Sequence, residues 1–179
     1  MPLLNVCFQG EKTFKVDADL IVTGRTCVIG ASESGKSYAV GVFCEELCKN
    51  NIPFALIDIE GEYSGLKEKY KMILVGEDER CDLNWSALNV KELARQALDI
   101  PPLILDVSEV EDRKGKIGEF LSEMFKEVSA RRTPYLIVLE EADKFVPQGG
   151  ERLKILEEVA RRGRKRGLVL CFAHKGLPL

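Results

Sequence analysis

The 179-residue sequence contains one histidine, one tryptophan and no C-x-x-C pair among its six cysteines. Because protein zinc sites are built mainly from clustered cysteine and histidine, this composition disfavours such a site. Cys44 and Cys48 lie one helical turn apart, and we interpret them as buried core thiols, with a metal or redox pair as the alternative. Scattered cysteines of this kind are typical of a reducing, intracellular compartment.

Long apolar runs are also missing. No stretch approaches the roughly 18 apolar residues that a membrane-spanning helix requires, so we expect no membrane partner. Residues 1–12 have neither the basic start nor the apolar stretch of a signal peptide, which predicts a cytoplasmic protein. The net charge is −3 and the sequence pI is about 5.4, so a nucleic-acid partner would need a local basic patch.

The remaining composition, 45% hydrophobic and 31% charged, is that of a globular protein. We predict one domain over residues 1–179, in which residues 1–25 form short strands, at 3–8 and 13–22, that lead into the core. Continuous apolar runs, typical of strands buried on both faces, then alternate with helical patterns. This predicts an α/β fold with a mainly parallel sheet flanked by helices. The expected later strands are 26–29, 53–58, 71–75, 103–107, 135–139 and 168–173, and the expected helices are 36–49, 90–98, 117–128 and 153–160.

Residues 30–37 read GASESGKS, which is the phosphate-binding P-loop pattern G-x-x-x-x-G-K-S. Its glycines let the backbone curl around an anion, and its N–H groups point at phosphate at the start of a helix. An apolar strand pattern precedes the motif and a helical pattern follows it; a chance glycine turn is the alternative. We expect ATP and Mg²⁺ here, with Lys36 on the phosphates and the Ser37 hydroxyl on the metal. The predicted nucleotide-binding residues are Gly30, Ala31, Ser32, Glu33, Ser34, Gly35, Lys36, Ser37 and Tyr38.

Acidic residues follow the expected strand 53–58. Asp58, Glu60 and Glu62 leave its carboxyl end, which is the edge where open α/β sheets bind ligands. On these residues alone, a solvated acidic loop is the favoured interpretation. Trp85, in an irregular stretch over 81–86, is interpreted as packing rather than as a base-stacking platform.

The stretch 135–141 is an apolar strand that ends in Glu140 and Glu141, which is the form of a Walker B element. Delivered beside the P-loop, Glu140 could hold Mg²⁺ directly or through a water, and Glu141 could polarise the attacking water. A plain strand-end turn is the alternative.

Basic residues cluster at the end of the expected helix 153–160. Five of the six residues 161–166 are basic, in an otherwise acidic chain. They are compatible with a solvated helix end, or with an arginine finger that reaches a neighbour's γ-phosphate together with contacts to nucleic acid. His174 ends the last strand, where it could sense the γ-phosphate or be a structural residue.

Four motifs taken together resemble a known family. GASESGKS, IDIEGEYSGL, YLIVLEEADKFVP and VARRGRKRGLVL, in this order over residues 21–174, are similar to the ATPase core of HerA helicases in the HerA–FtsK superfamily of P-loop motors. The resemblance implies a RecA-like sheet, a hexameric ring with ATP between subunits, and translocation of duplex DNA. Members of this superfamily act beside a nuclease, in conjugation, in chromosome pumping or in viral genome packaging.

The resemblance also implies roles for individual residues. Lys36 and Ser37 take the phosphate and Mg²⁺ roles, and Glu140 and Glu141 take the Walker B roles. Arg161 and Arg164 lie where the family's trans-acting arginine is expected, with no choice between them. His174 occupies the position of the family's usual glutamine sensor. The family's core normally continues past this strand, so we expect a minimal version, a truncated one, or one that has lost ring assembly.

The leading hypothesis is therefore a Mg-ATP-hydrolysing DNA motor of HerA/FtsK type that acts as an oligomeric ring. The main alternative is a regulatory or partner-loading P-loop NTPase that does not act on DNA, which the acidic pI favours. A small-molecule phosphotransferase and a non-hydrolysing binding module are further alternatives.

Overall fold

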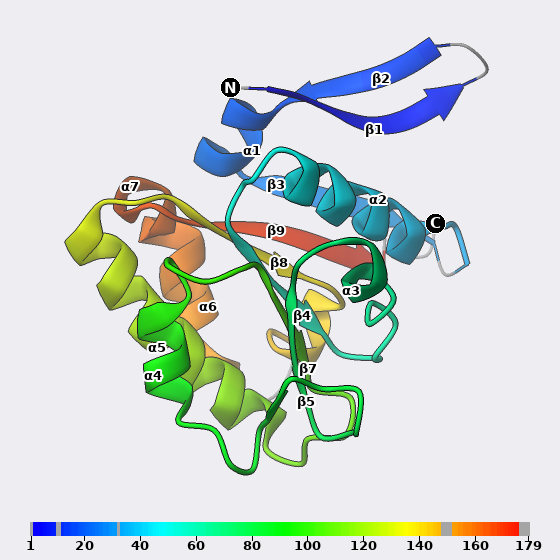
Figure 1. Cartoon of the computed structure of the whole chain (residues 1–179). Helices are drawn as coiled ribbons and strands as arrows, with labels where there is room; N and C mark the ends of the chain where they lie inside the picture. The colour runs from blue at the N-terminus through cyan, green and yellow to red at the C-terminus, as the bar shows by residue number, and fades with distance from the viewer. Residues whose placement is uncertain (1, 10–11, 32, 148–151, 176–179) are drawn as a thin grey trace.

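The computed structural model describes residues 2–9, 12–31, 33–147 and 152–175. Its centre is a seven-stranded sheet with all described neighbours parallel, in the order β3-β9-β8-β4-β7-β5-β6 (Figure 1). The predicted parallel α/β fold is confirmed. The strands are β3 (Thr26–Gly30), β4 (Phe54–Asp58), β5 (Ile73–Gly76), β6 (Leu83–Asn84), β7 (Leu103–Asp106), β8 (Tyr135–Leu139) and β9 (Leu168–Lys175).

Strand β4 shows why the central strands read as continuous apolar runs. Phe54 and Leu56 pack into the hydrophobic core on one face of the sheet, whereas Ala55 and Ile57 pack into the core on the other. All four side chains are fully buried. A parallel sheet with both faces covered needs apolar residues at every position of its inner strands.

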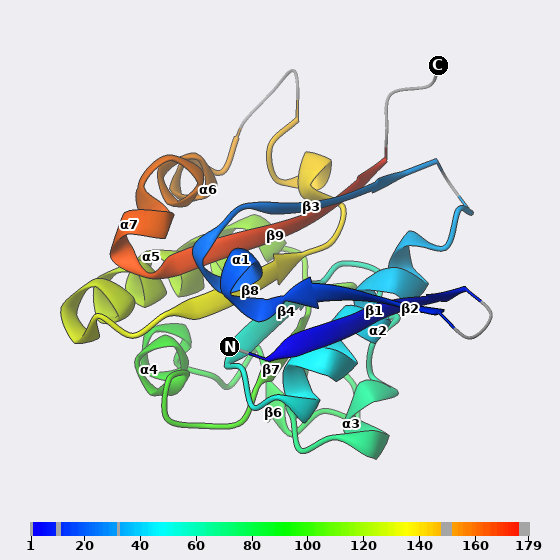
Figure 2. The same ribbon diagram turned by 90° about the horizontal axis from the view of Figure 1, so that it is seen from above.

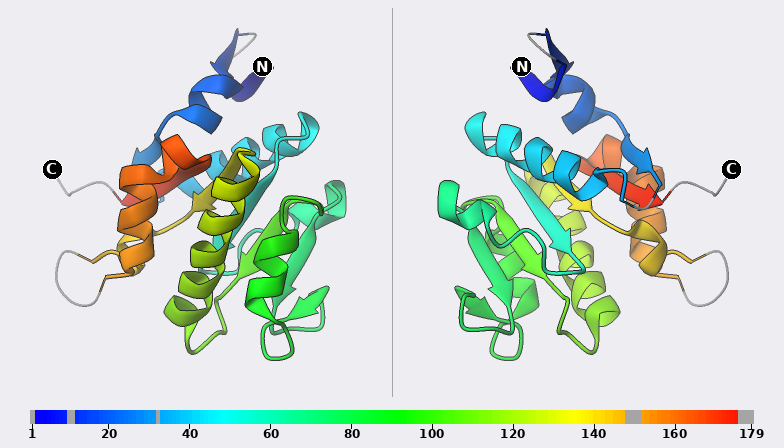
Figure 3. Two further views of the ribbon diagram at one scale, coloured as in Figure 1. Left: turned by 90° about the vertical axis from the view of Figure 1, so that its left-hand side faces the viewer. Right: turned by 90° about the vertical axis from the view of Figure 1, so that its right-hand side faces the viewer.

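The helices divide between the two faces (Figure 3). On one face lie α1 (Ala18–Thr23), α2 (Lys36–Lys49) and α3 (Leu66–Lys69). The other face carries α4 (Val90–Gln96), α5 (Arg113–Arg131) and α6 (Lys154–Glu158), and α6 continues through a π-helical turn (Val159–Gly163) into α7 (Arg164–Arg166). A short 3₁₀ turn, Ala142–Lys144, follows β8. None of the helices in the described ranges is long and apolar enough to span a bilayer.

The N-terminal hairpin, β1 (Leu3–Gln9) and β2 (Lys12–Asp17), is a separate antiparallel sheet that lies beside α2 (Figure 2). The Glu46 carboxylate of α2 accepts hydrogen bonds from the Asn5 backbone N–H at 2.8 Å and from the Asn5 side-chain amide at 3.3 Å. These bonds hold the hairpin against the helix. Lys49 pairs with the other oxygen of Glu46 at 2.8 Å, which balances the buried charge.

Two expectations about secondary structure were wrong. Residues 18–22 are helical rather than a strand, because the Asp17 carboxylate accepts the Asp19 N–H and caps α1, while Ile21 and Val22 face the core. The stretch 81–86 is not wholly irregular, since Leu83–Asn84 pairs with β5. Trp85 is fully buried and donates its indole N–H to the Asp106 carbonyl, so its assignment to packing is confirmed.

We expect Leu56→Ala to lower the free energy of unfolding by about 2–5 kcal/mol, because it opens a cavity in the middle of the sheet. Urea denaturation measures this change. Leu20→Ala is the matched control, since Leu20 is 67% exposed whereas Leu56 is 0% exposed. The control change should stay within about 0.5 kcal/mol. Equal effects in the two variants would contradict the burial described for β4.

Candidate nucleotide site

The P-loop joins β3 to α2 at the carboxyl edge of the sheet. Gly35 has φ +83°, a left-handed conformation that starts α2 and that glycine adopts without steric cost. A Cβ at Gly30 would lie 2.3 Å from the Ser34 hydroxyl oxygen, so the Ser34 side chain would have to move to admit any other residue. Lys36 lies across the loop and donates from Nζ to the Ala31 carbonyl at 2.6 Å. The loop therefore has the strand–loop–helix context that the motif requires.

One contact joins the P-loop to the Walker B strand across 103 residues of sequence. The Ser37 hydroxyl donates to Glu140 Oε1 at 2.6 Å. Glu140 is only 4% exposed, and its other oxygen, Oε2, is buried with no hydrogen-bond partner among the described residues. A serine hydroxyl beside a carboxylate with an unsatisfied oxygen is a donor set that suits Mg²⁺. The structure thus brings together the two residues that the sequence predicted as metal ligands.

Glu141 follows directly and has φ +48°, a left-handed conformation that is uncommon outside glycine. Such backbone strain is concentrated at functional sites. The half-buried Glu141 carboxylate has an ion pair with Lys144 Nζ at 3.9 Å. The two adjacent carboxylates therefore differ in their contacts: Glu140 accepts a hydrogen bond from Ser37, whereas Glu141 has an ion pair with Lys144.

Asp58, at the end of β4, organises the loop that follows. Its Oδ1 accepts the N–H groups of Gly61 at 2.8 Å and Glu62 at 3.2 Å, and its Oδ2 accepts the Tyr63 N–H at 2.9 Å. The interpretation of a solvated acidic loop is therefore wrong for Asp58, which is 0% exposed, although Glu60 and Glu62 are exposed. The Asp58 carboxylate can be buried because three backbone N–H groups donate hydrogen bonds to it.

Asp106 ends β7, the strand beside β4 in the sheet, and pairs in register with Asp58. Its Oδ1 accepts the Ser108 N–H at 2.9 Å and the Ser108 hydroxyl at 2.6 Å. Burial raises the pKa of Asp58 to about 6 against the lowering effect of the Tyr63 N–H, and the Asp106 charge adds to the rise. Gly61, with φ +74°, fits between the two loops, because a Cβ there would lie 3.1 Å from the Ser108 hydroxyl oxygen.

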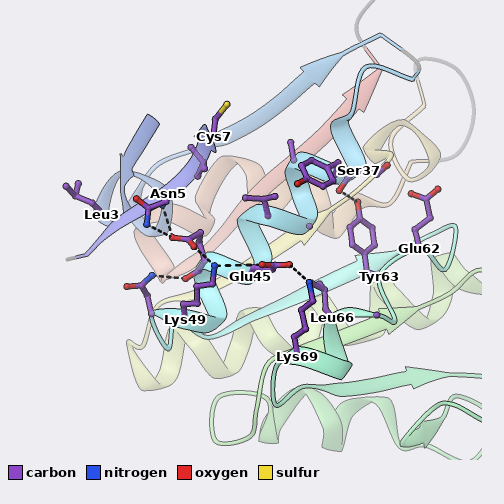
Figure 4. A pocket seen from close by; sticks show the side chains of 18 residues that line it. Leu3, Asn5, Cys7, Ser37, Glu45, Lys49, Glu62, Tyr63, Leu66 and Lys69 are labelled. Atoms are coloured by element: carbon purple, nitrogen blue, oxygen red, sulfur yellow. Dashed lines mark hydrogen bonds and ion pairs between the residues drawn. The ribbon is translucent and has the colours of Figure 1, made fainter. Parts of the chain in front are cut away.

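Tyr63 links this loop to the P-loop helix. Its hydroxyl donates to the Ser37 carbonyl at 3.3 Å, and its side chain is 5% exposed (Figure 4). Burial, followed by the nearby Glu140 carboxylate, raises the pKa of the Tyr63 phenol, so the hydroxyl stays protonated at neutral pH. The Asp58 loop therefore positions an uncharged donor beside the Ser37–Glu140 pair.

The basic segment is not part of this cluster. Arg161 and Arg164 are exposed in the π-helical turn and in α7, which precede the first residue of β9. Leu168 pairs with Tyr135, so this is the amino edge of the sheet, whereas the P-loop lies at the carboxyl edge (Figure 1). The segment therefore lies at the opposite end of the sheet from the P-loop of its own chain.

His174 lies in β9, between the P-loop strand and the Walker B strand. Its backbone pairs with Ile29, one residue before the P-loop begins. Its position at the carboxyl edge agrees with the predicted strand end. The His174 side chain and Ser32 of the P-loop lie outside the described part of the structure.

Sequence reasoning assigned no role to Asp106 or Ser108 and did not foresee the contact of Tyr63 with Ser37. A signal for Asp106 was present, because it ends an apolar run in the same way as Asp58 and neighbouring parallel strands end at one edge. The Tyr63 contact has no signal in the sequence, because it depends on how the loop after β4 folds back.

The fold and the site define an α/β protein of P-loop NTPase type. The sequence profile of the family described as helicase HerA, central domain, matches residues 7–148, so the chain belongs to this family and is a HerA-like NTPase domain. The predicted resemblance to HerA proteins is confirmed. A comparison with curated proteins gave no match.

Among solved structures, the chain is similar to the genome packaging NTPase B204 from Sulfolobus turreted icosahedral virus 2. The complex of B204 with AMPPCP gives a TM-score of 0.59 at 15% identity, over 87% of this chain and 66% of that one. The complex of B204 with ATP-gammaS gives 0.56 at 16% identity, over 86% and 64%. The chain thus spans slightly less than two thirds of the B204 chains, and at these identities the likeness concerns the fold.

The pKa of Asp58 can be measured from its carboxyl ¹³C shift, and we expect a midpoint near pH 6 rather than the value of about 3.9 of an unfolded chain. Because the folded state binds this proton more tightly, Asp58 adds stability below about pH 4, and this contribution is lost as the pH rises through 6. Asp58→Asn should remove the pH dependence in that window. A midpoint near 4 in the wild-type protein would contradict the described burial.

Proposed function

We propose that this protein is a Mg-ATP-hydrolysing DNA motor of HerA/FtsK type that acts as an oligomeric ring, hexameric by family resemblance. The observation that carries the proposal is the hydrogen bond from the Ser37 hydroxyl of the P-loop to Glu140, the acid that follows β8. Membership of the HerA family supports a motor role. The genome packaging NTPase B204 has a similar fold, and its structure is of a complex with AMPPCP, which supports nucleotide binding by this fold.

Mg²⁺ would be held by the Ser37 hydroxyl and the Glu140 carboxylate, whose Oε2 is buried without a hydrogen-bond partner among the described residues. When bound, the ion would neutralise charge that develops on the phosphates. Lys36 and the loop N–H groups would bind and orient the triphosphate. Glu141, half-buried and next to Glu140, would accept a proton from the attacking water.

The exposed basic segment supports a role between molecules. Arg161 and Arg164 lie at the opposite end of the sheet from their own P-loop, so in this conformation they suit a contact with a neighbouring subunit or with DNA rather than with their own nucleotide. In a ring, one of them would act as the arginine finger on the next subunit's γ-phosphate. His174 would sense the γ-phosphate, and a nuclease or another DNA-processing protein would be the partner.

Replacement of the proposed base tests the hydrolytic role. We expect Glu141→Gln to lower ATP turnover about 10²- to 10⁴-fold while ATP binding persists, because the variant cannot take the proton. Steady-state phosphate release and equilibrium ATP binding measure the two effects. Glu119→Gln removes an exposed carboxylate from α5 on the far face and is the matched control. Undiminished turnover in Glu141→Gln would sink the assignment of the base.

The motor role is tested by turnover measured against protein concentration, with and without duplex DNA, alongside light-scattering mass. Turnover should rise with assembly and DNA, and should fall in Arg161→Ala or Arg164→Ala by about 10³-fold or more for the finger. Lys15→Ala removes an exposed cation from the hairpin and should leave turnover unchanged. DNA binding should weaken steeply with salt.

A slow, concentration-independent turnover that ignores DNA in a pure monomer would instead favour a regulatory or partner-loading NTPase. A DNA titration that is flat and independent of salt would support the same alternative, because phosphate contacts release counterions.

A further inference from the structure

Three turns lie side by side at the amino edge of the sheet (Figure 2). They lead into β3, β9 and β8, which are neighbours in the sheet. The turns before β8 and β9 are in contact, since the Tyr135 N–H donates to the Gly167 carbonyl at 2.8 Å. The turn before β3 is next to them, because Arg25 and Arg164 line the same hollow of about 140 Å³. The three turns therefore form one continuous surface.

Each of these turns carries exposed cations. The turns comprise residues 24–25, 132–134 and 164–167, and none of these residues is acidic. We call this surface the basic edge. Its exposed cations are Arg25, Arg132, Arg164, Lys165 and Arg166. The basic edge is therefore strongly positive, although the whole chain has a net charge of −3.

The cations of the basic edge are not used to hold the fold together. Their neighbour Arg131 shows the contrast, because its ion pairs with Asp99 at 2.6 Å and Glu127 at 3.4 Å neutralise it. Besides the candidate finger Arg164, four exposed cations have no ion pair or side-chain hydrogen bond within the described ranges: Arg25, Arg132, Lys165 and Arg166. Gathered like charges create a local field that attracts a polyanion.

The carboxyl edge of the sheet has the opposite charge. Exposed acids follow three neighbouring strands there: Glu60 and Glu62 after β4, Glu109 and Glu111 after β7, and Glu77 and Glu79 after β5. These acids would repel a polyanion from the surface around the P-loop. A polyanion larger than a nucleotide is therefore directed to the basic edge.

The composition of the basic edge indicates which polyanion it fits. Besides its cations, the three turns contain only glycine, threonine and proline. Arginine, lysine and threonine side chains are among the groups that contact DNA phosphates. Aromatic residues, which are enriched in protein interfaces and on which single-stranded nucleic acids stack, are missing from these turns. The backbone of duplex DNA therefore fits this surface better than a protein or a single strand.

We propose that the basic edge binds the phosphate backbone of duplex DNA without reading its sequence, with Arg25 and Arg132 as phosphate contacts alongside Lys165 and Arg166. This inference rests on the proposed function, which makes the chain a DNA motor. It extends the DNA contact to two arginines outside the basic segment, and it leaves Arg161 and Arg164 as the candidate fingers.

The test measures the salt dependence of equilibrium binding to duplex DNA, with the full chain, Mg²⁺ and AMPPCP. Arg25→Ala and Arg132→Asn should each weaken binding equally for duplexes of different sequence. Each should also reduce the slope of log K against log[salt] by about 1 for every subunit that contacts the DNA. Asparagine is chosen at position 132 because it tolerates the left-handed backbone there, with φ +54°.

Two further variants serve as controls. Arg132→Lys keeps the charge and should retain the wild-type slope. Arg80→Ala changes the net charge by the same single unit, but Arg80 is an exposed arginine in the loop after β5, where it pairs with Asp78. It should leave the slope unchanged.

The outcomes separate this inference from the proposed function. If Arg25→Ala and Arg132→Asn bind duplex DNA with the wild-type slope, the basic edge is not the DNA contact, although the motor proposal stands. A wild-type slope together with a lower light-scattering mass would make it a contact between subunits instead, and tighter binding of single-stranded DNA would also overturn the inference. If the wild-type protein binds duplex DNA without any salt dependence, the motor proposal and this inference both fail.

Discussion

The hydrogen bond from Ser37 to Glu140 depends on every layer of the fold. It requires the P-loop strand and the Walker B strand to end at the same edge, with only β9 between them. Parallel strands end together, and a parallel sheet is stable only when helices cover both its faces. The two hydrophobic cores, one against α2 and one against α4 and α5, therefore hold a contact that spans 103 residues of sequence.

The buried acids at this edge are stabilised in different ways. Asp58 and Asp106 accept hydrogen bonds from backbone N–H groups and from a serine hydroxyl, which holds their loops in place. Glu140 receives one hydrogen bond on Oε1, whereas Oε2 has no partner among the described residues. An unsatisfied buried carboxylate oxygen is costly, and this is the observation behind the proposed Mg²⁺ site at Glu140.

The proposed nucleotide site and the basic segment lie at opposite ends of the sheet. This separation fits the proposed ring, in which the P-loop of each subunit would face one neighbour and its basic segment would face the other. Arg161 and Arg164 are too far around the sheet to contact the P-loop of their own chain in this conformation. A groove of about 1310 Å³ along α2, between the N-terminal hairpin and α3, adds an internal division. Its far part joins the hairpin to α2 through Asn5 and Glu46, and its near end lies at Ser37 of the P-loop.

The sequence by itself determined the parallel α/β fold, the P-loop and the Walker B strand, because continuous apolar runs and the GASESGKS pattern are local signals. It did not determine that residues 18–22 turn into a helix, that Asp58 is buried, or that Tyr63 reaches Ser37. Those outcomes were decided by the tertiary structure. Asp58 is buried where three backbone N–H groups converge on its carboxylate, and that convergence depends on how the loop after β4 folds back over the strand end.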